Sequence, residues 1–198
     1  MIFWDVDTQV DFMDRKGRLY VPGAETIIPN LRSLTQWAKQ HHILVVASMC
    51  AHQKDDPEFQ QYPPHCLVGT PGQQKIPETQ LPNRFLVPNC PVDIPANLHD
   101  YDQVVVEKQQ VDVFTNPNME ALLAALGSKE EIVLYGVVTE ICVAYAARGL
   151  LDRGYRLTLV SDAVRHLDDA RARATLTEIG KRAGRIASAR EAMREQTA

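Results

Sequence analysis

One cysteine of this 198-residue chain stands where a reactive thiol would be expected. The run Glu131–Tyr135 is apolar enough to be a buried strand, and it leads through Gly136 to Thr139, a residue type that caps helices. Cys142 then begins a stretch rich in alanine and leucine that predicts a helix. A helix start favours the thiolate, which is the form of cysteine that attacks carbonyl carbon. Cys142 is therefore the candidate nucleophile, and a small buried apolar side chain is the alternative interpretation.

Alternating apolar runs and amphipathic stretches predict the elements that would position this cysteine. The expected strands are residues 2–7, 43–48, 84–87, 104–108, 131–135, 156–161 and a short run at 185–187. Helices are expected over residues 25–39, 119–126 and 168–181, and from residue 142 onward. Repeated strand–helix–strand units predict an α/β fold, a three-layer αβα sandwich with a mainly parallel, Rossmann-like central sheet.

In a parallel sheet, functional side chains gather beyond the carboxyl ends of the strands. Asp7 would end the first strand, Cys50 and His52 would follow the second, and Lys108 would end another. We therefore expect these side chains to meet Cys142 at one rim, although they lie far apart in the sequence.

Length and composition predict a single domain over residues 1–198. The hydrophobic fraction of 45% and the charged fraction of 23% are those of an ordinary soluble domain. The segment from about residue 49 to 100 holds most of the prolines and has little apolar periodicity. We expect it to form an ordered lid or a pocket wall.

Charge and hydropathy exclude several classes of partner. The net charge of −4 argues against a nucleic-acid partner, and the basic residues near the C-terminus alternate with acids as on a solvated helix face. No stretch is apolar enough to span a membrane and no leader is visible, so we expect a cytoplasmic protein with no membrane partner. The four cysteines are expected to be thiols or metal ligands. No glycine-rich phosphate loop is found, and no nucleotide cofactor is expected.

Five segments, in chain order, resemble the isochorismatase-like cysteine hydrolases, most closely the nicotinamidases. They are residues 7–12 (DTQVDF), 21–29 (VPGAETIIP) and 62–72 (YPPHCLVGTPG), Lys108, and residues 136–142 (GVVTEIC). Each segment alone would be a weak signal, but together they cover nearly the whole chain. The segments at 21–29 and 62–72 are those that favour nicotinamidases within the superfamily.

The resemblance implies a catalytic triad of Asp7, Lys108 and Cys142. Asp7 would accept the thiol proton and later return it to departing ammonia, while Lys108 would hold positive charge beside the thiolate. The resemblance also implies a non-proline cis peptide between Val137 and Val138. The N–H groups of Val138 and Cys142 would form the oxyanion hole.

The metal site is where this chain departs from the family. Nicotinamidases have an Asp-x-His pair and a later histidine that bind a divalent metal, and the matching residues here are Cys50, His52 and His65. Residues two apart in an extended segment point the same way, so Cys50 and His52 can converge. A cysteine with two histidines suits one divalent ion, zinc above all. The alternative is a lost site whose histidines only form hydrogen bonds, and the role of Asp55 and Asp56 stays open.

Two aromatic residues, Phe12 and Tyr62, match family positions that supply walls to a ring pocket, although both could be ordinary core aromatics. Stacking between such walls favours a flat heteroaromatic amide over a small aliphatic one.

The expected function is hydrolysis of nicotinamide, or a related small-molecule amide, to the acid and ammonia through a cysteine thioester. This reaction would serve NAD salvage, and the resemblance further implies a homo-oligomer. One alternative is an isochorismatase-type vinyl ether hydrolase, a chemistry in which the cysteine is dispensable. The other is a non-enzymatic member of the fold that acts as a binding or oligomerising module.

Overall fold

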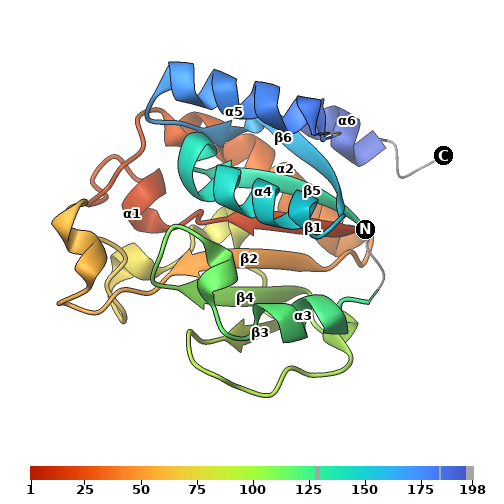
Figure 1. Ribbon diagram of the computed structural model, residues 1–198, viewed down its shortest axis with the longest axis horizontal. Helices are drawn as coiled ribbons and strands as arrows, with labels where there is room; N and C mark the ends of the chain where they lie inside the picture. The colour runs from red at the N-terminus through yellow and green to blue at the C-terminus, as the bar shows by residue number, and fades with distance from the viewer. Residues whose placement is uncertain (128–129, 183, 195–198) are drawn as a thin grey trace.

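A seven-stranded parallel sheet forms the centre of the computed structural model, which describes residues 1–127, 130–182 and 184–194. The strand order is β3-β4-β2-β1-β5-β6-β7, and each neighbouring pair is parallel. The strands are β1 (Ile2–Val6), β2 (Val45–Cys50), β3 (Arg84–Val87), β4 (Gln103–Lys108), β5 (Glu131–Val137), β6 (Arg156–Arg165) and β7 (Arg185–Ala187). In Figure 1 the carboxyl ends of β2 and β4 point to the left, toward the loops that follow them.

Helices cover both faces of this sheet (Figure 1). They are α1 (Val10–Met13), α2 (Ile28–Gln40), α3 (Met119–Ala125), α4 (Ala144–Asp152), α5 (Asp169–Lys181) and α6 (Ala189–Arg194). Apolar side chains of α3, α4 and α5 pack in one core cluster, and those of α2 and α6 pack in a second cluster. The predicted α/β sandwich with a parallel central sheet is thereby confirmed.

The apolar sequence patterns account for the two cores. All five residues of β1 are buried, as expected for a central parallel strand covered on both faces. Successive side chains of a strand alternate between faces, so Trp4 lies in the first cluster and Phe3 in the second. Leu31 and Leu34 of α2 are completely buried, as expected for the apolar stripe of an amphipathic helix.

The segment around Cys142 differs from its prediction. The strand continues to Val137, and Thr139–Val143 form a π-helical turn before α4 begins at Ala144. Thr139 was expected to cap the helix, but that prediction is wrong. Its hydroxyl is buried without a hydrogen-bond partner among the described residues, and the carbonyl of Val138 instead accepts the N–H groups of Ile141 and Val143.

Short 3₁₀ turns dominate the segment between β2 and β4. They are η2 (Pro57–Gln60), η3 (Pro71–Gln73), η4 (Pro77–Thr79) and η5 (Leu98–Asp100); further turns are η1 (Ala24–Ile27) and η6 (Val113–Thr115). Lys75 anchors this segment, because its Nζ lies 2.6 Å from Oδ2 of the buried Asp5 and 2.8 Å from the hydroxyl of Thr8. Its role as a lid, and the assignment of the whole chain to one domain, stay predictions.

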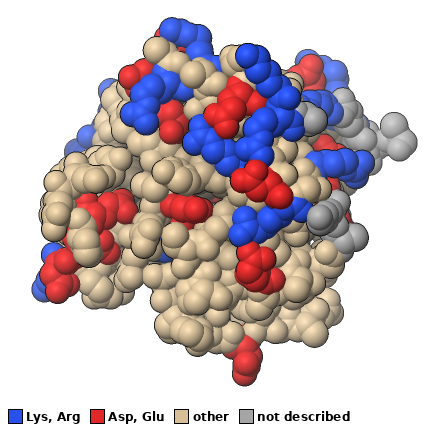
Figure 2. All heavy atoms as spheres, viewed as in Figure 1, with Lys and Arg blue, Asp and Glu red and all other residues tan. Residues whose placement is uncertain are grey.

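Basic side chains gather over the upper part of the molecule, where α5 lies, with acidic ones between them (Figure 2). This agrees with the solvated helix face expected there. None of the helices in the described part of the chain has the length and apolarity to cross a membrane.

Gly136 allows β5 to pass close to β1. Its φ is 120°, and a Cβ atom built there would lie 2.1 Å from the carbonyl oxygen of Val6. Both the backbone angle and the close contact exclude a side chain.

We expect Gly136→Ala to lower the free energy of unfolding by at least about 3 kcal/mol, because it forces β1 and β5 apart. Gly180→Ala is the matched control: Gly180 lies in α5, and no atom lies within 4 Å of the position that a Cβ would occupy there. Gly180→Ala should raise the free energy of unfolding by about 0.5–1 kcal/mol. Urea unfolding of both variants measures the difference, and equal stabilities would contradict the close approach.

Candidate active site

The ammonium of Lys108 lies at the centre of the site. It is completely enclosed at the end of β4, and its Nζ is 3.0 Å from Oδ2 of Asp7. The same nitrogen lies 3.1 Å from Sγ of Cys50 and 3.6 Å from Sγ of Cys142, and it donates to the carbonyl oxygen of Gln110 at 3.0 Å. The structure therefore brings Asp7, Lys108 and Cys142 together at one rim, as the strand ends predicted, with Cys50 among them.

Asp7 is held by groups from two neighbouring strands. It follows β1 with a φ of 50°, in the left-handed region that residues other than glycine seldom adopt. The hydroxyl of Ser48 donates to its Oδ1 at 2.6 Å, which leaves Oδ2 facing Lys108 and the thiol of Cys50, 4.0 Å away. Oδ2 is therefore the carboxylate oxygen that faces Lys108 and Cys50.

Burial sets the protonation of the two thiols. It raises the pKa of Cys142 well above the ordinary 9.0, with Lys108 opposing and Asp7 adding to the rise. Burial likewise raises the pKa of Cys50 to about 12. Burial works to lower the pKa of Lys108, but Asp7 and the two thiols more than offset it, and the net direction is upward. Burial therefore favours the thiol form of Cys142, whereas the helix start alone favours the thiolate.

The expected cis peptide between Val137 and Val138 is present. It lies immediately before the turn that carries Cys142, and Val138 is buried beside that residue in the pocket wall.

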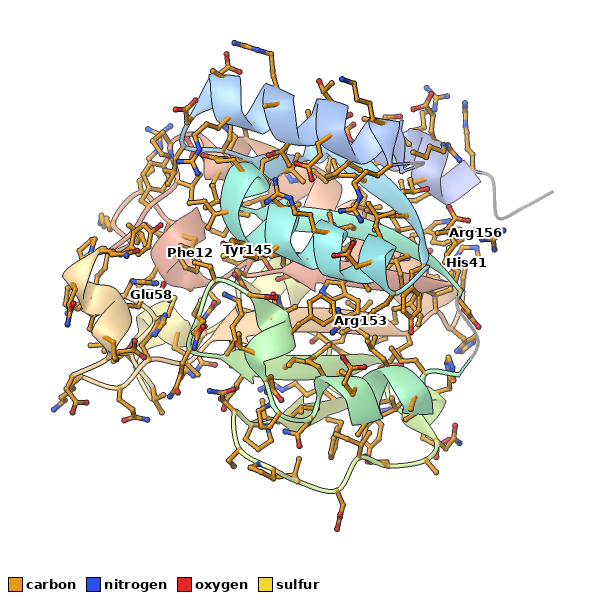
Figure 3. The ribbon with its side chains drawn as sticks, in the orientation of Figure 1. Phe12, His41, Glu58, Tyr145, Arg153 and Arg156 are labelled. Carbon is orange, nitrogen blue, oxygen red and sulfur yellow. The ribbon has the colours of Figure 1, made fainter. Side chains whose placement is uncertain are left out.

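A narrow apolar pocket leads to Cys142. Its volume is about 30 Å³, room for roughly one water molecule, and both Phe12 and Tyr62 line it, as predicted. Their rings lie 5.3 and 6.5 Å from that of His65, centroid to centroid. Figure 3 shows Phe12 on α1, Tyr145 on α4 and Glu58 on η2 at the same end of the molecule.

An open cleft of about 480 Å³ adjoins this pocket. The two share Glu58, Tyr62 and Val111, which therefore form the boundary between them. Figure 2 shows acidic side chains on the left-hand lobe and a hollow between that lobe and the rest of the molecule.

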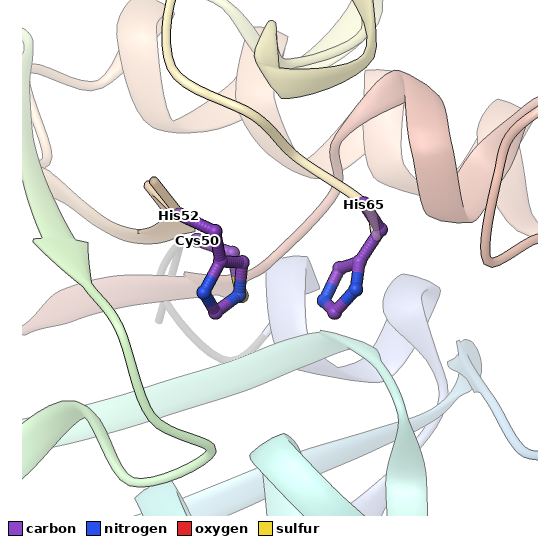
Figure 4. A group of neighbouring side chains, drawn as sticks. All are labelled: Cys50, His52 and His65. Atoms are coloured by element: carbon purple, nitrogen blue, oxygen red, sulfur yellow. The ribbon is translucent and has the colours of Figure 1, made fainter. Parts of the chain in front are cut away.

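The three predicted metal ligands also lie together. Cys50, His52 and His65 are buried, and each offers a ligand atom within 4.8 Å of the others. Figure 4 shows the two imidazole rings side by side, with Cys50 behind His52. The ring centroids of His52 and His65 are 4.7 Å apart, with an interplanar angle of 62°. Their backbones come from the end of β2 and from the loop that pairs with it through the bridge between His52 and Leu67.

Hydrogen bonds fix which imidazole nitrogen is left for a ligand. Nδ1 of His52 lies 2.9 Å from Oδ2 of Asp56, and Nδ1 of His65 lies 2.9 Å from the carbonyl oxygen of Pro63. The Nε2 atom of His52 is buried without a hydrogen-bond partner in the described part of the chain. Burial also lowers the pKa of His65, which favours the neutral imidazole that binds metals. This pattern is typical of histidines prepared for a metal ion.

Several functional residues were not found from the sequence. Ser48 could have been, since it precedes Cys50 by two residues in a strand and so shares its face. Gln9 clamps Cys50, because its side chain both accepts the N–H of Cys50 and donates to its carbonyl oxygen, each at 2.8 Å. The structure shows Asp56 as the hydrogen-bond partner of His52. No sequence pattern indicated Glu58. Asp11 accepts the N–H of Cys66 at 2.6 Å, which is a structural role.

Comparison with known proteins assigns this chain to a family. Residues 83–191 match the isochorismatase domain. A streptothricin hydrolase of Streptomyces noursei is 30% identical over 158 residues, or 80% of this chain and 47% of that protein, so the chain spans about half of its length. A nicotinamidase of Acinetobacter baylyi is 26% identical over 179 residues, covering 82% of this chain and 80% of that protein.

Solved structures show the same architecture. An isochorismatase-like hydrolase from Alkaliphilus metalliredigens superposes with a TM-score of 0.81 at 25% identity, covering 98% of both chains. The pyrazinamidase of Pyrococcus horikoshii in complex with zinc gives a TM-score of 0.77 at 26% identity, covering 94% of this chain and 98% of that one. The matched domain, the fold and these hydrolase relatives agree, and the chain belongs to the isochorismatase family of hydrolases.

Proposed function

We propose that this protein is an amidase of nicotinamidase type, which hydrolyses nicotinamide or a related heteroaromatic amide to the acid and ammonia. The observation that carries the proposal is the Lys108 ammonium in contact with Asp7 and with the thiol of Cys142, at the end of a narrow apolar pocket. The likeness to a nicotinamidase and to a pyrazinamidase supports the choice of substrate.

The proposed first step forms a thioester. Asp7 takes the proton of Cys142, whose sulfur attacks the amide carbonyl carbon, while the Lys108 ammonium stabilises the developing thiolate. The N–H groups of Val138 and Cys142 are the proposed donors to the oxyanion. Asp7 then gives its proton to the amine nitrogen as the C–N bond breaks, and ammonia leaves.

Water completes the cycle. With Asp7 again ionised, it accepts a proton from the water that attacks the thioester carbon, and the C–S bond breaks to release the acid. The proton returns to Cys142, so the resting thiol is restored.

Phe12 and Tyr62 are proposed to hold the flat ring of the substrate, and such stacking contributes about 0.5–1.5 kcal/mol per contact. The pocket is narrow in this structure, so its walls must separate for a ring to enter.

A larger amide is the second candidate substrate. The open cleft beyond Glu58, Tyr62 and Val111 could hold the rest of such a molecule, and the likeness to a streptothricin hydrolase favours it. Comparing kcat/KM for nicotinamide with that for amides bearing bulky substituents separates the two candidates.

Cys50, His52 and His65 are proposed to hold one divalent metal ion, zinc in preference to harder ions because one donor is a thiol. Nε2 of His52, which is buried and has no hydrogen-bond partner among the described residues, supports this fit. When bound, the ion would supply a Lewis acid for the ring nitrogen of a substrate. A cytoplasmic location, a role in NAD salvage and a homo-oligomeric state are further proposals, drawn from the family resemblance.

Ammonia release from nicotinamide tests the function and the nucleophile together. We expect the purified protein to release ammonia and Cys142→Ala to lose at least about 10³-fold of that activity, because no sulfur remains to form the thioester. Cys90→Ser is the matched control, since Cys90 is exposed, and it should keep full activity. Turnover by Cys142→Ala at the wild-type rate would refute the nucleophile assignment.

Alkylation at varied pH tests the pairing of Asp7 with the thiol. Because the pKa of Cys142 lies above 9.0, its rate of alkylation should rise about tenfold per pH unit between pH 7 and 9. Asp7 raises this pKa, so Asp7→Asn should lower it and speed alkylation severalfold at pH 8, while amide hydrolysis is lost. Mass spectrometry of iodoacetamide-labelled Cys142 gives the rates, with Cys90 as the internal reference. Slower labelling in Asp7→Asn would show that the carboxylate does not oppose the thiolate.

A further inference from the structure

Leu167 is the most exposed of the residues that line the narrow pocket in front of Cys142. It is 46% exposed, whereas the other residues of the pocket wall are buried or half-buried. Leu167 lies in the loop of residues 166–168, between the end of β6 and the start of α5. In Figure 1 α5 begins at the end of the molecule where α1 lies. One wall of the pocket is therefore a loop side chain that solvent also reaches.

A buried carboxylate holds this loop in place. Oε1 of Glu140 accepts the N–H of Leu167 at 2.9 Å and the N–H of Asp168 at 2.7 Å. Oε2 of Glu140 has no hydrogen-bond partner among the described residues, so these two N–H groups are the partners that they give the carboxylate. Glu140 is 7% exposed and lies two residues before Cys142 in the same π-helical turn. One side chain therefore joins the turn of the nucleophile to the outer wall of its pocket.

We propose that Leu167 sets the size of the substrate that reaches Cys142 and that Glu140 positions Leu167, an inference that rests on the proposed function. The pocket of about 30 Å³ must widen before it can hold a ring. Phe12 and Val138 are buried, whereas nearly half of Leu167 faces solvent, so displacing Leu167 breaks fewer packing contacts. A ring that enters would also cover the exposed apolar surface of Leu167, which favours binding.

The hydrogen bonds of the loop confine this displacement to the side chain of Leu167. Glu140 holds the N–H groups of Leu167 and Asp168, and Asp168 in turn caps α5 by accepting the N–H of Arg171 at 2.9 Å. The backbone is therefore fixed while the leucine side chain can change its rotamer. A flat single-ring amide fits beneath such a side chain, whereas a fused-ring amide of greater width is opposed by it.

Substrate preference tests the role of Leu167. The two substrates are nicotinamide and a quinoline carboxamide, which is nicotinamide with a fused benzene ring. Leu167→Ala should raise kcat/KM for the fused-ring amide by about tenfold or more relative to that for nicotinamide, because the side chain that opposes the wider ring is shortened. The change should appear in KM rather than in kcat, since Leu167 has no part in the proposed chemical steps.

Leu86→Ala is the matched control for this comparison. Leu86 is 48% exposed, lies on β3 and does not line the pocket, so this variant should keep the wild-type preference. A wild-type preference in Leu167→Ala would overturn the role of Leu167.

Alkylation of Cys142 tests the same opening without an amide substrate. The ratio of the labelling rates for bulky N-phenylmaleimide and small iodoacetamide reports the width of the pocket and reduces the effect of changes in thiol reactivity. We expect this ratio to rise severalfold in Leu167→Ala, and also in Glu140→Ala, where the loop loses its anchor. Glu140→Gln retains an oxygen that accepts the two N–H groups and should restore the wild-type ratio. A wild-type ratio in Glu140→Ala would overturn the positioning role of Glu140.

The proposed function and the role of Leu167 can fail separately. A higher labelling ratio in Leu167→Ala, in a protein that does not hydrolyse nicotinamide, would support the role of Leu167 and refute only the proposed substrate. Hydrolysis of nicotinamide together with a wild-type labelling ratio in Leu167→Ala would overturn the role of Leu167 and leave the proposed function in place.

Discussion

The contact between the enclosed Lys108 ammonium and the Asp7 carboxylate is the interaction on which the rest of the site depends. Neither charge could be buried alone, since an unpaired ion loses its hydration without compensation. Paired at 3.0 Å, they keep a positive and a negative charge at the ends of two strands. The two thiols then lie beside a cation and a proton acceptor at once, which is what thioester chemistry needs.

The position of Cys50 affects the electrostatics of the site. Its sulfur is nearer to Lys108 than the sulfur of Cys142 is, at 3.1 against 3.6 Å. Two thiols therefore compete for one ammonium while Cys50 carries its proton. A metal ion bound to Cys50 would remove that competition, so the proposed metal site and the proposed nucleophile would be coupled through the ammonium of Lys108.

Sequence reasoning predicted the sheet and the rim well, because both follow from short-range patterns. Apolar strands that alternate with amphipathic helices are compatible with few sheet topologies. In a parallel sheet the carboxyl ends of the strands lie at one edge, which brings Asp7, Lys108 and Cys142 together. Glu58 was missed because it lies in a segment without periodicity, where only the three-dimensional path of the chain brings it to the histidines. The protonation of Cys142 is a similar case, because a helix start favours its thiolate whereas burial favours its thiol. A helix start can be recognised in a sequence, but the depth of burial that outweighs it cannot.

The hydrogen bonds between the side chain of Gln9 and Cys50 lie between two parts of the site that could change independently during evolution. The side chain of Gln9 also donates to the carbonyl oxygen of Gln73. One amide group therefore joins the loop after β1 both to the carboxyl end of β2 and to the segment that follows β2. The proposed catalytic residues Asp7, Lys108 and Cys142 lie at or just beyond the ends of β1, β4 and β5. Glu58, Tyr62 and His65 instead belong to a single stretch of chain tethered at such points. Evolution could therefore remodel that stretch to accept a different amide while leaving the hydrolytic machinery intact. Such modularity offers a physical reason why relatives that share this architecture carry the names of different substrates.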